Sequence, residues 1–191
     1  AIYGFNKKRL NEDTGPLMPI SNYGAMKLAS EALISASVES FLEKACIYRF
    51  PNIVGTPATH GVIFDFIKKL QDDKTQLNVL GNGSQKKSYL HVSELIDAMF
   101  FINENTSDGL NYYNVGPNDD GVYVKQIAEE TAKIVSTNAQ IFYQKSDRGW
   151  VGDVPKFRYS IEKLKKLGWH PKSSSIDAVK RAIIEIYNQK S

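Results

Sequence analysis

The sequence predicts an α/β fold, because segments with the apolar spacing of helices alternate with short apolar runs of strand length. The clearest helix signal is the stretch 25–44, which contains no glycine or proline and follows Ser21, a residue type that often caps helices. An apolar run at 45–50 comes directly after it and is typical of a buried strand. The next segment, 51–61, contains glycine, proline and threonine and is predicted as a loop at the carboxyl end of that strand, where α/β sheets bind ligands.

The remaining elements are predicted from the same two signals, the apolar spacing of helices and short apolar runs of strand length. Residues 1–4 are predicted as the end of a buried strand and residues 5–20 as a loop. Ser93 is expected to cap a helix over 94–104. The other predicted elements, in chain order, are a helix from residue 61, a strand at 77–80 with a turn at 81–83, a strand at 86–92, a strand at 110–115, a helix at 124–135, a strand at 139–143, a helix at 161–167 capped by Ser160, and a last helix with an apolar stripe from Ile176 to Ile186.

The composition is that of an ordinary globular protein and argues against several function classes. The 191 residues are 42% hydrophobic and 24% charged, with a formal net charge of +3. Lysines are scattered along the chain rather than gathered in a basic arm, so we expect no nucleic-acid partner. No apolar run approaches the roughly 18 residues that a membrane span needs, and no secretory leader is visible, so we expect a cytoplasmic protein without membrane contact.

The metal-ligating residue types show no pattern of a metal site. Cys46 is the only cysteine of the 191 residues, which excludes a disulfide within them. The three histidines, at positions 60, 91 and 170, lie far apart and lack the spacing of zinc ligands. We therefore expect no structural metal.

Tyr23 and Lys27 carry the strongest chemical signal. They are four residues apart near the first turn of the predicted helix, which places both side chains on one face. An ammonium group and the positive end of the helix favour the phenolate form of a nearby tyrosine, which is a general base able to take a proton from an alcohol. A surface tyrosine beside a solvated lysine is the alternative that spacing alone leaves open. The same spacing occurs twice more, at Tyr3/Lys7 and Tyr159/Lys163, but neither pair lies within a long predicted helix.

The residues around this pair resemble a known family. Met18-Pro-Ile-Ser-Asn-Tyr-Gly-Ala-Met-Lys-Leu-Ala-Ser-Glu31, followed by Arg49-Phe-Pro-Asn-Ile-Val-Gly55, resembles the extended short-chain dehydrogenase/reductases that act on nucleotide sugars, most closely the UDP-glucose 4-epimerase group. The resemblance extends over essentially the whole chain. It implies the C-terminal part of a Rossmann fold plus a small α/β substrate-binding domain. Residues 1–55 would be the remnant of the NAD-binding Rossmann domain, and residues 56–191 mainly the substrate-binding domain, with some segments returning to the Rossmann sheet.

The resemblance also implies roles for individual residues. Tyr23 would be the catalytic base, and Lys27 would support it and hold the nicotinamide ribose of NAD beside Phe50 and Pro51. Asn52 would contact the diphosphate of a UDP-sugar; from the residues alone, an Asx turn after the strand is the alternative.

Further substrate contacts are implied along the rest of the chain. Asn78 and Leu80 would lie against the uracil, with Gly61 and Val62 nearby. Lys87 stands where family members commonly carry an arginine, and it would neutralise phosphate as a point charge; a solvated strand end is its alternative. The last implied substrate contacts are Arg148, which lies two residues upstream of the family's arginine position, Asp153 in the Gly-Asp pair, and Phe157 where some members have a tyrosine against the sugar.

Parts of the family's cofactor site are not found in the 191 residues. No glycine-rich turn of the Gly-x-Gly-x-x-Gly kind is present, and the family's catalytic serine or threonine would come just before Ala1. We therefore expect the chain to be the C-terminal part of a longer enzyme, with an incomplete NAD site and no activity alone. Its apolar face is expected to form a homodimer or to bind the N-terminal half.

The type of reaction is inferred from the first residues. Dehydratases of the family typically carry Asp-Glu-Val-Tyr-Gly where this chain has Ala1-Ile-Tyr-Gly4. Ala1 and Ile2 therefore argue against dehydration, which favours a 4-epimerase acting through a transient NAD-dependent 4-keto sugar. A non-catalytic nucleotide-sugar-binding half-protein and another nucleotide-sugar oxidoreductase of the family are the alternatives that stay open.

Overall fold

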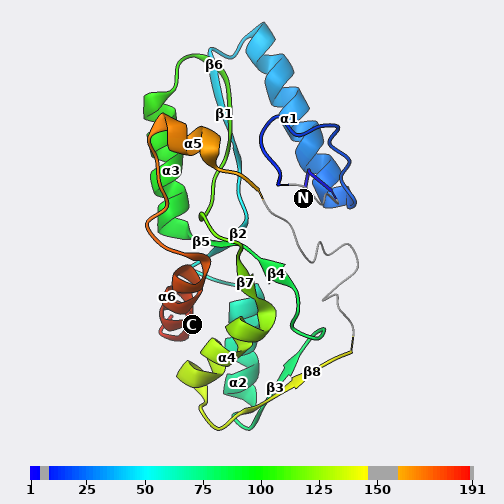
Figure 1. Cartoon of the computed structure of the whole chain (residues 1–191), viewed down its shortest axis with the longest axis vertical. Helices are drawn as coiled ribbons and strands as arrows, with labels where there is room; N and C mark the ends of the chain where they lie inside the picture. The colour runs from blue at the N-terminus through cyan, green and yellow to red at the C-terminus, as the bar shows by residue number, and fades with distance from the viewer. Residues whose placement is uncertain (5–8, 146–158, 190–191) are drawn as a thin grey trace.

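The computed structural model describes residues 1–4, 9–145 and 159–189, and helices pack on short strands throughout them (Figure 1). The predicted α/β fold class is confirmed. The elements in chain order are α1 (Asn22–Ser40), β1 (Lys44–Arg49), β2 (Asn52–Val54), α2 (Val62–Asp72), β3 (Gln76–Val79), β4 (Lys86–Lys87), β5 (Tyr89–His91), α3 (Val92–Asn105), β6 (Gly109–Asn114), β7 (Val122–Tyr123), α4 (Val124–Val135), β8 (Gln140–Tyr143), α5 (Glu162–Leu167) and α6 (Ser175–Tyr187).

The strands form four pairs, and most of the pairing is parallel. β1 pairs with β6, β2 with β5 and β3 with β8 in parallel register, whereas β4 and β7 are antiparallel. Figure 1 shows α1 on one side of the β1–β6 pair and α3 with α5 on its other side. The β1–β6 pair is therefore covered by helices on both faces, as parallel strands require.

Helix α1 begins as expected but buries little of its surface. The Ser21 hydroxyl accepts a hydrogen bond from the Gly24 amide at 3.1 Å, which satisfies one of the free amides at the helix start. Gly24 is the only buried residue of α1. A side chain at this position would lie 2.9 Å from the carbonyl oxygen of Ala1, so glycine lets the helix start lie directly against the N-terminal segment.

Two hydrophobic clusters form the core of the described residues. The first, which we call the α2–α4–α6 cluster, joins those three helices to β3. The second, the α3–β6–α5 cluster, lies around Ile102, Tyr113 and Leu164 and packs against Cys46 and Tyr48 of β1. Helix α1 contributes no residue to either cluster.

Several of the predicted elements differ from the structure. Residues 1–4 form a turn instead of a strand end, because no described strand lies beside them. The predicted loop 51–61 contains β2, and the predicted strand 86–92 is split at Ser88 into β4 and β5, which pair with different strands. Helix α3 begins at Val92, so that the imidazole of His91 caps it by accepting a hydrogen bond from the Ser93 amide at 3.2 Å; the prediction that Ser93 is the cap was wrong.

Candidate functional site

Tyr23 and Lys27 lie on one face of α1, in its first turns. The Lys27 Nζ atom is 5.6 Å from the centre of the Tyr23 ring, a distance at which the ammonium is attracted to the ring face. The Tyr23 side chain is 65% exposed and is therefore open to a ligand rather than packed into the core. The two side chains therefore lie close together, as their spacing predicts.

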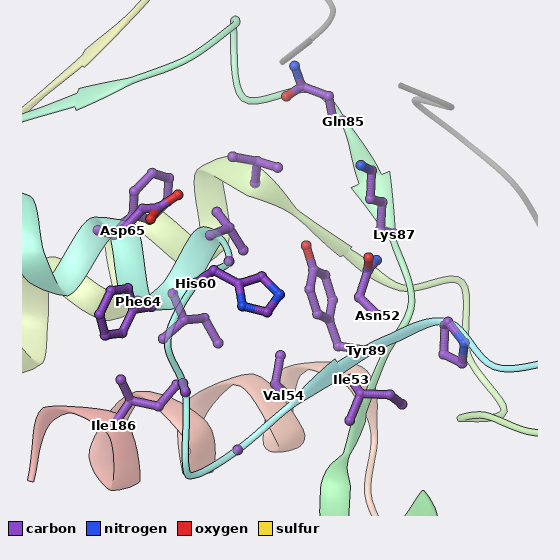
Figure 2. A pocket seen from close by; sticks show the side chains of 18 of the residues that line it. Asn52, Ile53, Val54, His60, Phe64, Asp65, Gln85, Lys87, Tyr89 and Ile186 are labelled. Atoms are coloured by element: carbon purple, nitrogen blue, oxygen red, sulfur yellow. The ribbon is translucent and has the colours of Figure 1, made fainter. Parts of the chain in front are cut away.

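A pocket of about 680 Å³, which we call the larger pocket, lies beside this face and is built from segments far apart in the sequence (Figure 2). Asn52 of β2 and Tyr89 of β5 are register partners, and Figure 2 shows both side chains in this pocket. Eight residues with a role implied by the family resemblance line it, namely Tyr23, Phe50, Pro51, Asn52, Gly61, Val62, Leu80 and Lys87.

The polar groups of the larger pocket come from its two sides. Helix α2 begins at Gly61 and Val62 on the pocket wall, so its first-turn N–H groups and the positive end of its dipole face the pocket. On the opposite side, Lys86 and Lys87 point away from each other, as successive strand residues do. The Lys86 Nζ atom lies 5.1 Å from the centre of the Tyr123 ring, whereas Lys87 lines the pocket.

Two residues predicted to contact the substrate, Asn78 and Asn52, make hydrogen bonds within the chain. Asn78 is exposed on β3 and does not line the larger pocket; its carbonyl oxygen accepts a hydrogen bond from Lys69 Nζ at 2.9 Å. The Asn52 amide nitrogen of the side chain donates to the Ser88 carbonyl at 3.3 Å. This bond ties Asn52 to the chain between β4 and β5 and so orients its side chain in the pocket.

A smaller pocket of about 410 Å³ lies between α1 and β1. Lys27 lines it, together with the N-terminal residues 1–4 and Arg49. Tyr23, Phe50 and Pro51 line both pockets, so they form the boundary between the two. A phenol at this boundary is able to reach groups bound on either side.

Arg49 holds α1 against β1 beside this boundary. Its guanidinium donates to the Glu31 carboxylate at 2.7 Å and to the Tyr3 hydroxyl at 3.0 Å. Burial works against the charge of Arg49, but the bonds with Glu31 and Tyr3 outweigh burial and raise the pKa of the guanidinium above its usual value. The Tyr112 ring of β6 lies 5.6 Å from the guanidinium carbon.

Sequence reasoning missed the Arg49–Glu31 pair, although a signal was present. Tyr23, Lys27 and Glu31 follow one another at intervals of four residues, which places all three on one helix face. Arg49 ends the strand that packs on that face. A charged residue at the end of an apolar strand next to a carboxylate on the facing helix was therefore a recognisable pairing.

The other predicted contacts, Arg148, Asp153 and Phe157, lie outside the described residues. Within the described part of the chain, no group of three or more histidine, cysteine, aspartate or glutamate side chains is arranged to hold a metal ion. None of the helices in that part is long and apolar enough to cross a membrane.

The comparisons with known proteins agree on one family. The model of the NAD dependent epimerase/dehydratase family matches residues 1–116. Among curated proteins, a probable GDP-L-fucose synthase 1 of Oryza sativa subsp. japonica is 26% identical over 184 residues, which are 91% of this chain and 53% of the relative. A UDP-glucose 4-epimerase of Azospirillum brasilense is 24% identical over 203 residues, which are 96% of this chain and 57% of the relative.

Solved structures show the same similarity in three dimensions. A crystal structure of a UDP-galactose 4-epimerase is 31% identical, with a TM-score of 0.84 over 97% of this chain and 59% of that chain. A UDP-glucose 4-epimerase from Thermotoga maritima, crystallised with UDP-glucose, is 25% identical, with a TM-score of 0.80 over 97% of this chain and 60% of that chain. The chain thus spans between half and two thirds of the length of these relatives.

Proposed function

The chain belongs to the NAD-dependent epimerase/dehydratase family, and we propose that it carries the nucleotide-sugar pocket and the Tyr/Lys pair of a UDP-glucose 4-epimerase-like enzyme. The observation that carries the proposal is the position of Tyr23 at the boundary of the two pockets, with the Lys27 ammonium 5.6 Å from its ring. A base at such a boundary serves a reaction between two bound molecules.

The larger pocket would bind the UDP-sugar. Lys87 and the N-terminal end of α2, at Gly61 and Val62, supply positive potential from two sides, which suits a diphosphate or the carbonyl groups of a base. Asn52 supplies a neutral polar group in the pocket. The proposed contacts from Leu80, Arg148, Asp153 and Phe157 would complete the site.

The smaller pocket would receive the nicotinamide end of NAD. Its boundary residues fit this group: the Phe50 ring and Pro51 offer an apolar wall, and Lys27 offers an ammonium for the ribose hydroxyls. When bound, NAD supplies the hydride acceptor that turns the sugar 4-hydroxyl into a transient ketone. These residues bind and orient the cofactor, while most of the cofactor would lie on parts of the protein beyond this pocket.

The proton moves at Tyr23. In the proposed reaction its phenolate oxygen takes the proton of the sugar 4-hydroxyl and later returns it, so that Tyr23 acts as base and then as acid. The nearby Lys27 ammonium stabilises the phenolate by its charge. The Arg49–Glu31 pair positions both groups by holding α1 on β1.

The organisation of the whole protein is part of the proposal. Residues 1–55 would complete an NAD-binding domain, and residues 56–191 would form most of the substrate-binding domain. Because the 191 residues contain no glycine-rich pyrophosphate turn, we expect the chain alone to bind UDP-sugars without converting them. Exposed apolar side chains of α1, among them Met26 and Leu33, would be covered by a second copy or by the N-terminal half.

One experiment tests these statements together. The purified chain is incubated with UDP-galactose and NAD⁺, product formation is measured by chromatography, and UDP-galactose binding is measured by calorimetry. We expect binding and no turnover. Robust turnover would contradict the expected inactivity, and failure to bind any UDP-sugar would contradict the proposed function itself.

A second candidate is a GDP-sugar oxidoreductase, favoured by the relative from Oryza sativa subsp. japonica named a GDP-L-fucose synthase. Calorimetry with UDP and GDP in parallel separates the two. Preference for GDP would support the second candidate, and preference for UDP would support the first.

A further inference from the structure

Gln85 lies on the wall of the larger pocket, and its side-chain amide is buried. The proposed function gives this amide no role, and the hydrophobic core does not include it. The residue is 2% exposed. Within the described parts of the chain, neither its side-chain nitrogen nor its side-chain oxygen has a hydrogen-bond partner. Figure 2 shows Gln85 and Lys87 along the same edge of the pocket. An amide left unpaired in this way destabilises a protein, so its presence in a pocket wall points to a ligand.

The main chain around Gln85 is held firmly. Its carbonyl oxygen accepts a hydrogen bond from the Val124 amide at 2.9 Å, and the Gly83 carbonyl accepts one from the Lys125 amide at 3.1 Å. Both bonds come from the start of α4, one of the helices of the α2–α4–α6 cluster. The side chain therefore projects from a fixed point, and only its own torsions need to change for the amide to meet a ligand.

The register of the strand decides which residues act together. Lys86 is directed to the Tyr123 ring, while Gln85 and Lys87, two positions apart, both line the pocket. Two residues of extended chain span about 6.6 Å. A cation and a neutral amide at this spacing suit two different groups of one extended ligand, the cation its phosphate and the amide a neutral polar group.

Gln85 also lies close to the part of the pocket proposed for the base. Only the turn at 81–84 separates it from Leu80, which lines the same pocket. Gly81 and Gly83 of that turn have positive φ angles of 77° and 74°, so the chain reverses direction within it. Leu80 and Gln85 are thereby placed on either side of one tight reversal.

We propose that Gln85 is a base-binding residue whose carboxamide hydrogen bonds the N–H and C=O edge of the base in a nucleoside diphosphate sugar. The inference rests on the proposed function. A carboxamide donates and accepts at once and therefore matches adjacent N–H and C=O groups, which both uracil and guanine carry. It bears no charge, so it does not compete with Lys87 for the phosphates.

The test uses Gln85→Met, which keeps the length of the side chain and removes both polar atoms. Dissociation constants for UDP, GDP and inorganic pyrophosphate are measured by calorimetry on the 191-residue chain, and the melting temperature is measured without nucleotide. We expect binding of the preferred nucleotide to weaken about tenfold, the effect of one well-formed pair of hydrogen bonds. Pyrophosphate binding should stay unchanged, and the melting temperature should stay equal or rise, because the unpaired amide is gone.

Two further variants keep the result decisive. Lys87→Met should weaken the binding of UDP, GDP and pyrophosphate alike, since it removes the proposed phosphate contact. Gln85→Glu keeps the shape of the side chain but cannot donate and places a negative charge in the pocket, so its nucleotide binding should be weaker than that of Gln85→Met.

Five outcomes would overturn the inference. Unchanged nucleotide binding in Gln85→Met would mean that the amide serves an internal water or no partner. An equal loss for pyrophosphate, or a lower melting temperature with loss of all ligands, would make Gln85 a structural residue. Full binding by Gln85→Glu would exclude a donor role. If the unmodified chain binds no nucleotide at all, the proposed function fails first and this inference fails with it.

Discussion

The two regions that meet at Tyr23 differ in how they are packed. The α2–α4–α6 cluster buries an apolar stripe on each of its helices, for example Ile63, Phe66, Ile67 and Leu70 of α2. Helix α1, which carries the Tyr/Lys pair, buries only Gly24 and leaves Leu33 70% exposed. The region around the larger pocket is thus stabilised by its own core, whereas the Tyr/Lys pair lies on a helix that is held mainly by polar contacts and leaves apolar side chains exposed.

The largest expected effect is a loss of turnover without a loss of nucleotide binding. Tyr23→Phe removes the hydroxyl and keeps the ring, so in the complete enzyme it should lower kcat for UDP-galactose by about 10²- to 10⁴-fold. UDP affinity of the chain should change by less than about twofold, because in the proposed function the UDP contacts come from other residues of the larger pocket. Tyr187→Phe, at an exposed tyrosine on α6, is the matched control. Equal losses of kcat in both variants would remove Tyr23 from the mechanism.

The second largest expected effect is a difference in stability between variants of the two regions. Leu70 is fully buried in the α2–α4–α6 cluster, and Leu70→Ala should lower the free energy of unfolding by about 2–5 kcal/mol. The same substitution at Leu33 on α1 should change it by less than about 0.5 kcal/mol. Urea denaturation of both variants measures the difference. Similar values for the two would show that α1 is as well packed as α2.

The polar contacts that hold α1 should matter more than surface ion pairs. Arg49→Met leaves the Glu31 carboxylate, which is 17% exposed, without its cation, and should destabilise the chain by about 2 kcal/mol. The pair of Lys165 and Glu162, in which Glu162 is exposed and Lys165 half-buried, provides the control, because Lys165→Met should cause a much smaller change in urea denaturation. If Arg49→Met left the free energy of unfolding nearly unchanged as well, the Arg49–Glu31 pair would not hold α1 in place.

The smallest effect is a pH dependence within the packed region, where Glu185 of α6 bonds His91. Burial opposes the charge of Glu185, but hydrogen bonds with His91 and Arg181 outweigh burial and lower the pKa of its carboxyl from the ordinary 4.5. A carboxyl with a lowered folded-state pKa stabilises the fold above its ordinary pKa and loses that contribution as the pH falls through the lowered value.

The stability difference between the unmodified chain and Glu185→Gln should therefore shrink below about pH 4.5. Denaturation at pH 7 and at a series of acid pH values measures it. A difference that stays constant over this range would mean that the carboxyl is not stabilised by its partners.

Elements with a strong local pattern were predictable from the sequence. Helix α4 has the predicted bounds, Val124–Val135, because Ile127, Ala128 and Thr131 recur at helical spacing and are buried together. The start of α1 at Ser21 was predicted for the same kind of reason, since a cap acts within one turn. The strand β2 was missed because three residues carry no readable periodicity and are defined only by their pairing with β5.

Some features of the candidate site were likewise predictable from the sequence, and others were not. Tyr23 and Lys27 were found from the sequence, since residues four apart on a helix share a face whatever surrounds them. Which of Lys86 and Lys87 faces the pocket, and that Asn78 does not line it, depended on where β4 and β3 lie relative to their partners.

What the sequence alone determined about this protein is its family, its α/β class and the shared face of Tyr23 and Lys27, because each can be read from residue types and their spacing along the chain. Tertiary structure decided how Tyr23 comes to border two pockets, how Arg49 reaches Glu31 on another element, and how the Gln85 amide stays buried and unpaired. These last features arise between segments that are distant in the chain, and only the packing of the folded chain brings their atoms within hydrogen-bonding distance or keeps them apart.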